Sequence, residues 1–302
     1  MIGRFGKPAS LLEKAAASYT RQMDRWNTNF AEQSPLLTVL RTAALQVTGD
    51  DWPALSRLQE IITHAGICNA SGLPLQLLSP AAASATYEQR IYARGELEFR
   101  ERNWHDLFNV LVWLTFPRAK AALNARHHAA LPAGKAGGRG SVRDALTLFD
   151  ESGVIVLSTD AEMLDMIRGF RWKPLFWERR AAVIAGMEFL PFGHALCEKA
   201  LEPYKGITGR GLLFDVAQDF FKLPPAERLA TIDRSLALRI ADPQAMQHTH
   251  ELAPLPVLGV PGWCIDNEQP AYYDDRDHFR PGRVGRVPLP AGGDSQMLKE
   301  IR

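Results

Sequence analysis

The sequence predicts an α+β fold, in which a helical N-terminal half packs with a small mixed sheet and an irregular C-terminal segment follows. Two patterns predict this class. Apolar residues recur at helical spacing from residue 27 to residue 80, whereas compact β-branched runs alternate with helical stretches after residue 142. Such a mixture is typical of α+β proteins, and we expect its parts to form one integrated domain.

The first 130 residues (1–130) are expected to be mainly helical. Within them, residues 87–102 change to an alternation of apolar and charged side chains around a Gly-Glu pair, which predicts a β-hairpin. Helices are expected over residues 103–116 and 118–130. Pro117 lies between them, at the first helical position, which proline tolerates best.

Residues 131–141 (LPAGKAGGRGS) are expected to form a flexible glycine-rich loop. They do not have the spacing of a Walker phosphate-binding loop, and no strand precedes them. The region 142–302 is expected to be α/β and to end in a proline-rich segment. Its predicted strands cover residues 153–158, 181–189 and 211–216, and its predicted helices cover 143–151, 159–167, 193–201 and 224–240.

Composition excludes several classes of protein. The 35 Lys and Arg residues balance 34 Asp and Glu residues, so a nucleic-acid partner held by bulk positive charge is not expected. The 14 Phe and 7 Trp residues give too much apolar surface for a disordered chain. Three widely spaced cysteines favour a reducing compartment. Charges near the N-terminus and the lack of a long uncharged apolar run predict a cytoplasmic protein without a membrane partner.

An adjacent pair, His105-Asp106, is the clearest local candidate for chemistry. It is similar to the His-Asp pair of the HD phosphohydrolases, which shares a metal site with an upstream His and a later Asp; His64 and Asp150 would take those roles. The alternative is helix capping, because Asn103 suits the N-cap position and Asp106 follows three residues later, beside free N–H groups. Capping leaves His105 unexplained.

Other polar side chains recur at helical spacing after this pair. Asn109 lies one turn after His105, and Lys120 and Asn124 share another polar face with His127 or its neighbour. These positions are candidates for ligand binding. The alternative is an ordinary solvated helix surface.

Asp150 and Glu151 end a predicted helix immediately before a strand. Carboxylates at a helix C-terminus oppose the helix dipole, so they need a partner: a cation, a metal or a cluster of N–H groups. Arg143 lies on the same helical face as Asp150 and is a candidate ligand-binding cation. A structural arginine elsewhere is the alternative partner.

His194 and Glu198 lie four residues apart, directly after a predicted strand, where sites of α/β and α+β proteins often lie. The start of a helix lowers the pKa of a histidine, so a neutral His194 could act as a ligand or general base. The alternative is a buried histidine bonded to a backbone carbonyl.

The C-terminal segment holds a His248-x-His250 pair, which chelates a metal only if both side chains point the same way. Asn267 and Arg280 lie in an aromatic-rich stretch and are candidates for ligand binding. Alternatively, this stretch simply packs over the domain.

Several strings together resemble an uncharacterised bacterial family, domain of unknown function 3025, over about residues 87–283. The strings are NWHDLFNVLVWLTFPRAKAALNARH, RDALTLFDESGVIV, FGHALCEKAL, PGW and FRP. The resemblance implies that these polar clusters are typical of such proteins. It assigns no activity, cofactor or catalytic residue.

Three functional hypotheses follow from these residues. The first is an enzyme of hydrolase or transferase type that acts on a small anionic substrate, with catalytic residues among His105, Asp150, Glu151, His194 and Glu198. The second is a non-catalytic binding or regulatory module in which Lys120, Arg143 and Arg280 clamp an anion. The third is the HD-like metal-dependent phosphohydrolase. Convergence of the first set in one cleft would favour an enzyme; no motif specifies a cofactor, a metal or an oligomeric state.

Overall fold

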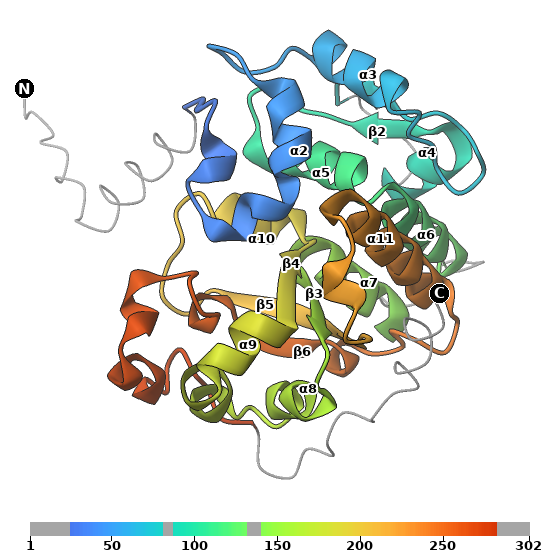
Figure 1. The fold of residues 1–302 in the computed structure, drawn as a ribbon. Helices are drawn as coiled ribbons and strands as arrows, with labels where there is room; N and C mark the ends of the chain where they lie inside the picture. Colours follow the sequence, from blue (N-terminus) through green and yellow to red (C-terminus); the bar gives the residue numbers. More distant parts are fainter. Residues whose placement is uncertain (1–24, 81–86, 132–139, 283–302) are drawn as a thin grey trace, which may run out of the picture.

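A four-stranded mixed sheet with the strand order β4-β3-β5-β6 lies between two groups of helices (Figure 1). The computed structural model describes residues 25–80, 87–131 and 140–282. Helices α2, α3, α4 and α5 lie at one end of the molecule, and α8 and α9 lie at the other (Figure 1). The predicted α+β class is therefore confirmed.

The strands of the large sheet are β3 (Gly153–Ser158), β4 (Met187–Pro191), β5 (Thr208–Asp215) and β6 (Ala253–Pro256). β3 pairs parallel with β5 and antiparallel with β4, and β5 pairs antiparallel with β6. Every residue of β3 is buried, as its continuous run of apolar, largely β-branched residues predicts for a strand covered on both faces. The third predicted strand, 211–216, corresponds to β5, which begins three residues earlier.

The helices before the large sheet are mostly short. They are α2 (Arg41–Ala44), α3 (Leu55–His64), α4 (Tyr87–Arg94), α5 (Trp104–Thr115), α6 (Pro117–Ala129) and α7 (Ser141–Ser152). The first of them is flanked by 3₁₀ turns at Pro35–Leu40 and Leu45–Val47. Helices α5 and α6 confirm the two helices predicted around Pro117, and Asn103 is confirmed as an N-cap because its Oδ1 accepts the N–H of Asp106 at 3.0 Å.

The predicted hairpin at residues 87–102 is wrong. Its first half is α4, and its second half contains β2 (Glu96–Glu98), which pairs parallel with β1 (Gln76–Leu78), a strand within the region expected to be helical. Gly95 has a φ of 71°, and its N–H donates to the carbonyl of Ile91 at 2.9 Å. A glycine in the left-handed region ends a helix in this way, so the Gly-Glu pair marks a helix C-terminus instead of a hairpin turn.

The predicted strand at residues 181–189 is also displaced. Residues Arg180–Gly186 form α9, and β4 starts only at Met187. The segment AAVIAG is rich in alanine, the best helix former, and it buries Val183 while Ile184 remains 66% exposed. A short apolar run has no periodicity that separates a strand from a helix.

The remaining helices follow the sheet strands. They are α8 (Ala161–Arg168), α10 (His194–Lys199) and α11 (Pro225–Ala241). After α11 the described chain is a series of 3₁₀ turns apart from β6, which confirms the irregular C-terminal segment. Of the predicted glycine-rich loop, residues 132–139 lie outside the described residues. Among the helices of the described residues, each falls short of the length and apolarity that crossing a lipid bilayer requires.

Aromatic packing fixes α10 against its neighbours. The ring of Phe192, which precedes α10, stacks on Phe149 of α7 with centroids 4.8 Å apart and contacts Phe116, which follows α5, at 5.6 Å. All three rings are fully buried. Helix α10 therefore lies against α5 and α7, and this contact brings the predicted polar clusters together.

Candidate functional site

A polar cavity of about 450 Å³ lies among α4, α5, α6, α7 and the start of α10. Among the residues singled out in the sequence, the lining includes His105, Asn109, Asp150, Glu151 and His194. They come from three helices and span about 90 residues of chain, between His105 and His194. The convergence expected of an active site is therefore present.

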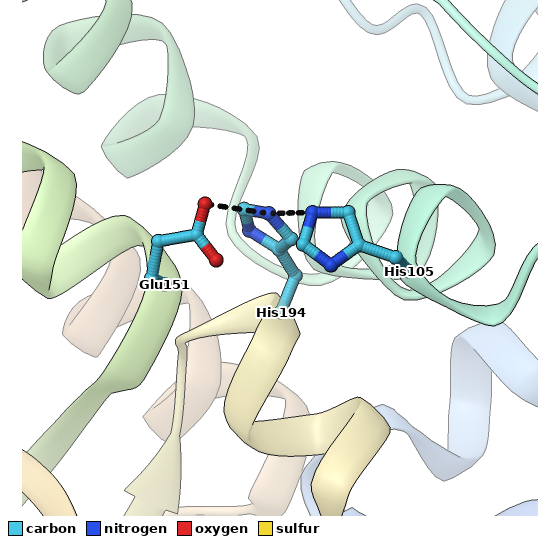
Figure 2. A group of neighbouring side chains, drawn as sticks. All are labelled: His105, Glu151 and His194. Atoms are coloured by element: carbon cyan, nitrogen blue, oxygen red, sulfur yellow. Dashed lines mark hydrogen bonds and ion pairs between the residues drawn. The ribbon is translucent and has the colours of Figure 1, made fainter.

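Two histidines face each other across this cavity. His105 lies in the first turn of α5, and His194 is the first residue of α10. Their Nε2 atoms are 3.0 Å apart, and the rings meet edge to face (Figure 2). Figure 2 also shows Glu151, at the end of α7, pointing toward the same place, with its Oε1 3.7 Å from Nε2 of His194.

Each imidazole has a carboxylate beside its outer nitrogen. Nδ1 of His105 lies 3.0 Å from Oε2 of Glu198, which is on α10 one turn after His194. Nδ1 of His194 lies 3.9 Å from Oδ1 of Asp150. The i, i+4 spacing that marked His194 and Glu198 therefore serves to place both beside His105.

Gly193 allows the start of α10 to approach the end of α7 closely. A Cβ atom at position 193 would lie 2.4 Å from the backbone nitrogen of Ser152 and 2.5 Å from the carbonyl oxygen of Glu151. In addition, the N–H groups of Phe192 and Gly193 both donate to the carbonyl of Gly153 at 2.9 Å. The end of α7 and the start of α10 are thus in direct backbone contact.

Burial and the neighbouring carboxylates set the charges of this centre. Burial lowers the pKa of His194 to about 4, so its imidazole is neutral at neutral pH. The hydrogen bond to Glu198 raises the pKa of His105 above its usual value. Burial also raises the pKa of Glu151.

A second polar group lines the same cavity, and sequence reasoning missed it. Glu88, in the first turn of α4, accepts a hydrogen bond from Nδ2 of Asn124 at 2.6 Å, and Tyr87 accepts one from Asn109 at 2.8 Å. Burial, reinforced by the charge of Asp150, raises the pKa of Glu88 to about 7. The mistaken hairpin concealed this pair, because it assigned Tyr87 and Glu88 to a strand.

The cavity also contains His127 and Thr147, from α6 and α7. Burial lowers the pKa of His127 to about 4, so this histidine is uncharged. The sequence offered His127 as one of two alternatives on the polar face of α6, and it is buried whereas its neighbour His128 is only partly covered. The polar face of α6 therefore points into the protein and not into solvent.

Asp150 is held by a buried lysine. Nζ of Lys120 lies 2.5 Å from Oδ1 of Asp150 and 5.7 Å from the centre of the Trp113 ring. Burial alone would raise the pKa of Asp150, but the charge and the hydrogen bond of Lys120 outweigh it and lower that pKa. Asp150 therefore has the cation that a carboxylate at a helix C-terminus requires, which makes it a positioning group.

Four predicted residues lie elsewhere or contact the site indirectly. Asn267 is buried in the C-terminal segment, where its Nδ2 donates to the carbonyls of Leu258 and Val260. Arg280 donates to the carbonyl of Asp277. Neither lines the cavity. Asn124 acts by holding Glu88, and the charge of Arg143 weakly opposes the effect of burial on the pKa of Glu88 and adds weakly to the effect of burial on the pKa of His127.

The HD-like arrangement has little geometric support. Both carboxylate oxygens of Asp106 accept hydrogen bonds from Arg100, through its backbone N–H at 2.7 Å and its guanidinium at 2.8 and 2.9 Å. His64 is exposed at the end of α3 and does not line the cavity. Within the described residues, the group that brings metal-ligand atoms together is His105, Glu151 and His194, whose atoms lie within 4.8 Å of one another.

Comparison with known proteins agrees with the resemblance of the sequence. The family described as protein of unknown function (DUF3025) matches residues 76–283, more than half of the chain. The chain belongs to this family. The part that matches DUF3025 contains every residue of the two-histidine centre and of the Glu88 group. The chain matches no curated protein and no solved structure.

Proposed function

We propose that this DUF3025 protein is an enzyme of hydrolase or transferase type that acts on a small substrate in the polar cavity. The observation that carries the proposal is the convergence of His105, His194, Glu151 and Glu88 on the lining of one cavity of about 450 Å³. Here separate helices aim them into a common space, as catalytic groups require.

The attacking water is placed where the two histidines and Glu151 meet. Glu88 is the general acid–base, since a carboxyl group with a pKa of about 7 is populated in both protonation states at neutral pH. Its carboxylate accepts a proton from the water, whose oxygen forms the bond to the acyl or phosphoryl centre. As the bond to the leaving group breaks, that group takes the proton back from Glu88.

The charges around the cavity support a substrate that carries an anionic group. Most carboxylates on the wall already have a cation, in the pairs Asp106–Arg100, Asp150–Lys120 and Glu98–Arg90. Arg143 is not itself part of the cavity lining, but it is partly buried, has no ion pair with any residue in the described ranges, and lies close enough to influence Glu88, which does line the cavity. We assign Arg143 to the anionic group of the substrate.

The non-catalytic alternative has less support. It needs Lys120, Arg143 and Arg280 to clamp one anion together. Lys120 is committed to Asp150, and Arg280 does not line the cavity.

We also place the enzyme in the cytoplasm of a bacterium, because the cysteines at positions 68, 197 and 264 are free thiols, as a reducing compartment favours.

Hydrolysis of p-nitrophenyl phosphate, bis(p-nitrophenyl) phosphate and p-nitrophenyl acetate tests the proposal. We expect release of p-nitrophenol from at least one of them, and a loss of about 100-fold or more in the Glu88→Gln variant. Glu227→Gln is a matched control, because Glu227 also lies in the first turn of a helix but is exposed. An inactive wild type, or a Glu88→Gln variant as active as wild type, would refute the proposal.

A further inference from the structure

We infer that His105, Glu151 and His194 bind one divalent cation of the zinc type and, resting on the proposed function, that this cation holds the attacking water. The inference stands on three features of the described residues. They are the separation of the inner ligand atoms, the carboxylates behind the imidazoles, and the hydrogen-bond partners that the two rings require.

The separation of the ligand atoms suits a tetrahedral ion. Bonds of about 2.0–2.1 Å in a tetrahedral zinc site place neighbouring ligand atoms about 3.4 Å apart. The Nε2 atoms of His105 and His194 are 3.0 Å apart, and Oε1 of Glu151 is 3.7 Å from Nε2 of His194. The ligand atoms of all three residues lie within 4.8 Å of one another, so a movement of about 1 Å, chiefly of the Glu151 carboxylate, would bring them into coordinating positions.

The carboxylates behind the imidazoles complete the pattern of a metal site. Histidines that bind metals usually direct their other ring N–H toward a carboxylate or carbonyl, which fixes the orientation and the tautomer. Glu198 lies at Nδ1 of His105, and Asp150 lies beyond Nδ1 of His194. Both rings therefore present Nε2 toward Glu151 and the cavity.

The hydrogen bonds of His194 provide independent support. With His105 neutral and its Nδ1 proton accepted by Glu198, a direct bond between the two Nε2 atoms requires His194 to donate its proton from Nε2. Nδ1 of His194 is then a bare acceptor facing the carboxylate of Asp150. His194 is 4% exposed; the backbone of Asp150 lies close enough to act on its ring, but its Nδ1 has no hydrogen bond of normal geometry among the described residues.

A cation at the centre removes this conflict. When Nε2 of both rings binds the cation, the proton of His194 resides on Nδ1 and points toward Asp150. The positive charge also compensates Glu151, which the described residues leave without a lysine or arginine ion pair. One ion thus accounts for both the buried lone pair of His194 and the carboxylate of Glu151.

The ligand set indicates which cation binds. Two imidazoles and one carboxylate, with an open fourth position, are typical of catalytic zinc sites, whereas magnesium and calcium prefer sites made entirely of oxygen. The open position faces the cavity that contains Glu88. Cobalt(II) occupies zinc sites of this kind and is the spectroscopic probe of choice.

Titration of the full-length protein with Co²⁺, after treatment with a chelator, tests the inference. We expect visible absorption bands that saturate at one equivalent and disappear when Zn²⁺ is added. His105→Gln, His194→Gln and Glu151→Gln should each weaken binding by about 100-fold or more. His248→Gln is the control, because His248 and His250 stack 5.1 Å apart on the surface and offer the other His pair of the described chain.

A substitution at a buried histidine can disturb folding, so Glu198→Gln provides a second test. Glu198 has 30% of its side chain exposed and orients His105 without binding the ion, so we expect a folded variant that binds Co²⁺ about 10–100-fold more weakly. Failure of wild type to bind one equivalent, or unchanged binding in Glu198→Gln and the ligand variants, would overturn the inference. An active enzyme that binds no ion would refute the inference alone, and stoichiometric binding without hydrolysis would refute the proposed function alone.

Discussion

The buried Lys120–Asp150 pair gives the clearest test of how the site is held together. Lys120 is 3% exposed and Asp150 is 9% exposed, and the two groups are 2.5 Å apart. We expect Lys120→Met to lower the free energy of unfolding by about 3–5 kcal/mol. Removal of one partner leaves an uncompensated charge in the interior, and effects of this size are typical of buried pairs.

Methionine at position 120 removes the charge of the lysine but keeps most of its packing, so the loss of stability reports the charge. Methionine has nearly the length of the lysine side chain, so the contacts with the Trp113 ring are largely retained and the loss of apolar burial is small. The other groups that act on Asp150 are His194, whose Nδ1 is 3.9 Å away, and His127; the lowered pKa values of both leave their imidazoles neutral at neutral pH. Nothing in the described surroundings therefore replaces the ammonium.

Urea unfolding in the presence of a chelator, followed by circular dichroism, measures the effect. The double variant Lys120→Met/Asp150→Leu should recover most of the lost stability, because replacing both members of a buried pair is often neutral or stabilising. Lys173→Met is the matched control: Lys173 pairs with Asp274 at 2.6 Å on the surface, and its loss should cost less than about 1 kcal/mol. A loss below about 1 kcal/mol for Lys120→Met, or no recovery in the double variant, would show that this reasoning is wrong.

Three other substitutions test separate parts of the site. Gly193→Ala should destabilise the protein by about 1–3 kcal/mol and weaken Co²⁺ binding, because the new methyl group would lie 2.4 Å from the backbone of Ser152. A thermal melt measures the stability, and the Co²⁺ titration measures the binding. A variant with wild-type stability and affinity would contradict the prediction. Asp106→Asn should lower the free energy of unfolding, measured with urea, by about 1 kcal/mol or less, because Asp106 binds the half-exposed Arg100. Co²⁺ binding should be unchanged. Loss of Co²⁺ binding would instead favour the HD-like interpretation. The pKa of Glu88 is raised to about 7, so the folded state binds more protons than the unfolded state between about pH 4.5 and 7 and its stability falls as pH rises through that window. Melts of Glu88→Gln should therefore show a gain relative to wild type at pH 8 that is absent at pH 4, and equal differences at both pH values would contradict this.

Much of the candidate site could be found from local features of the sequence. Asp150 and Glu151 attracted attention because carboxylates at a helix end are unfavourable, and His194 and Glu198 because their spacing places them on one face. These arguments need only the correct helix boundaries. The structure confirms those boundaries to within two residues for α7 and α10.

Other features depend on contacts that no local pattern contains. Helix α4 is short and polar, and it buries Arg90 by pairing it with Glu96 and Glu98, residues that follow the helix. The alternation that predicted a hairpin lies after this helix, where Leu97 and Phe99 alternate with charged residues, and extending it back over α4 concealed Glu88. The same holds for Lys120 and Asp150, which are 30 residues apart and gave no sign of their pairing.

The outer carboxylates, more than the helix caps, set the direction of the two histidines. Capping by Asn103 determines where α5 begins, but it leaves the ring of His105 free to rotate; the bond from Nδ1 to Glu198 is what turns Nε2 toward His194. Asp150 occupies the corresponding place behind His194, and Lys120 holds it there. The Lys120–Asp150 pair thus supports the chemistry indirectly, because Lys120 orients Asp150 and Asp150 faces the imidazole of His194. It follows that substitutions at Glu198 should separate chemistry from folding more cleanly than substitutions at either histidine.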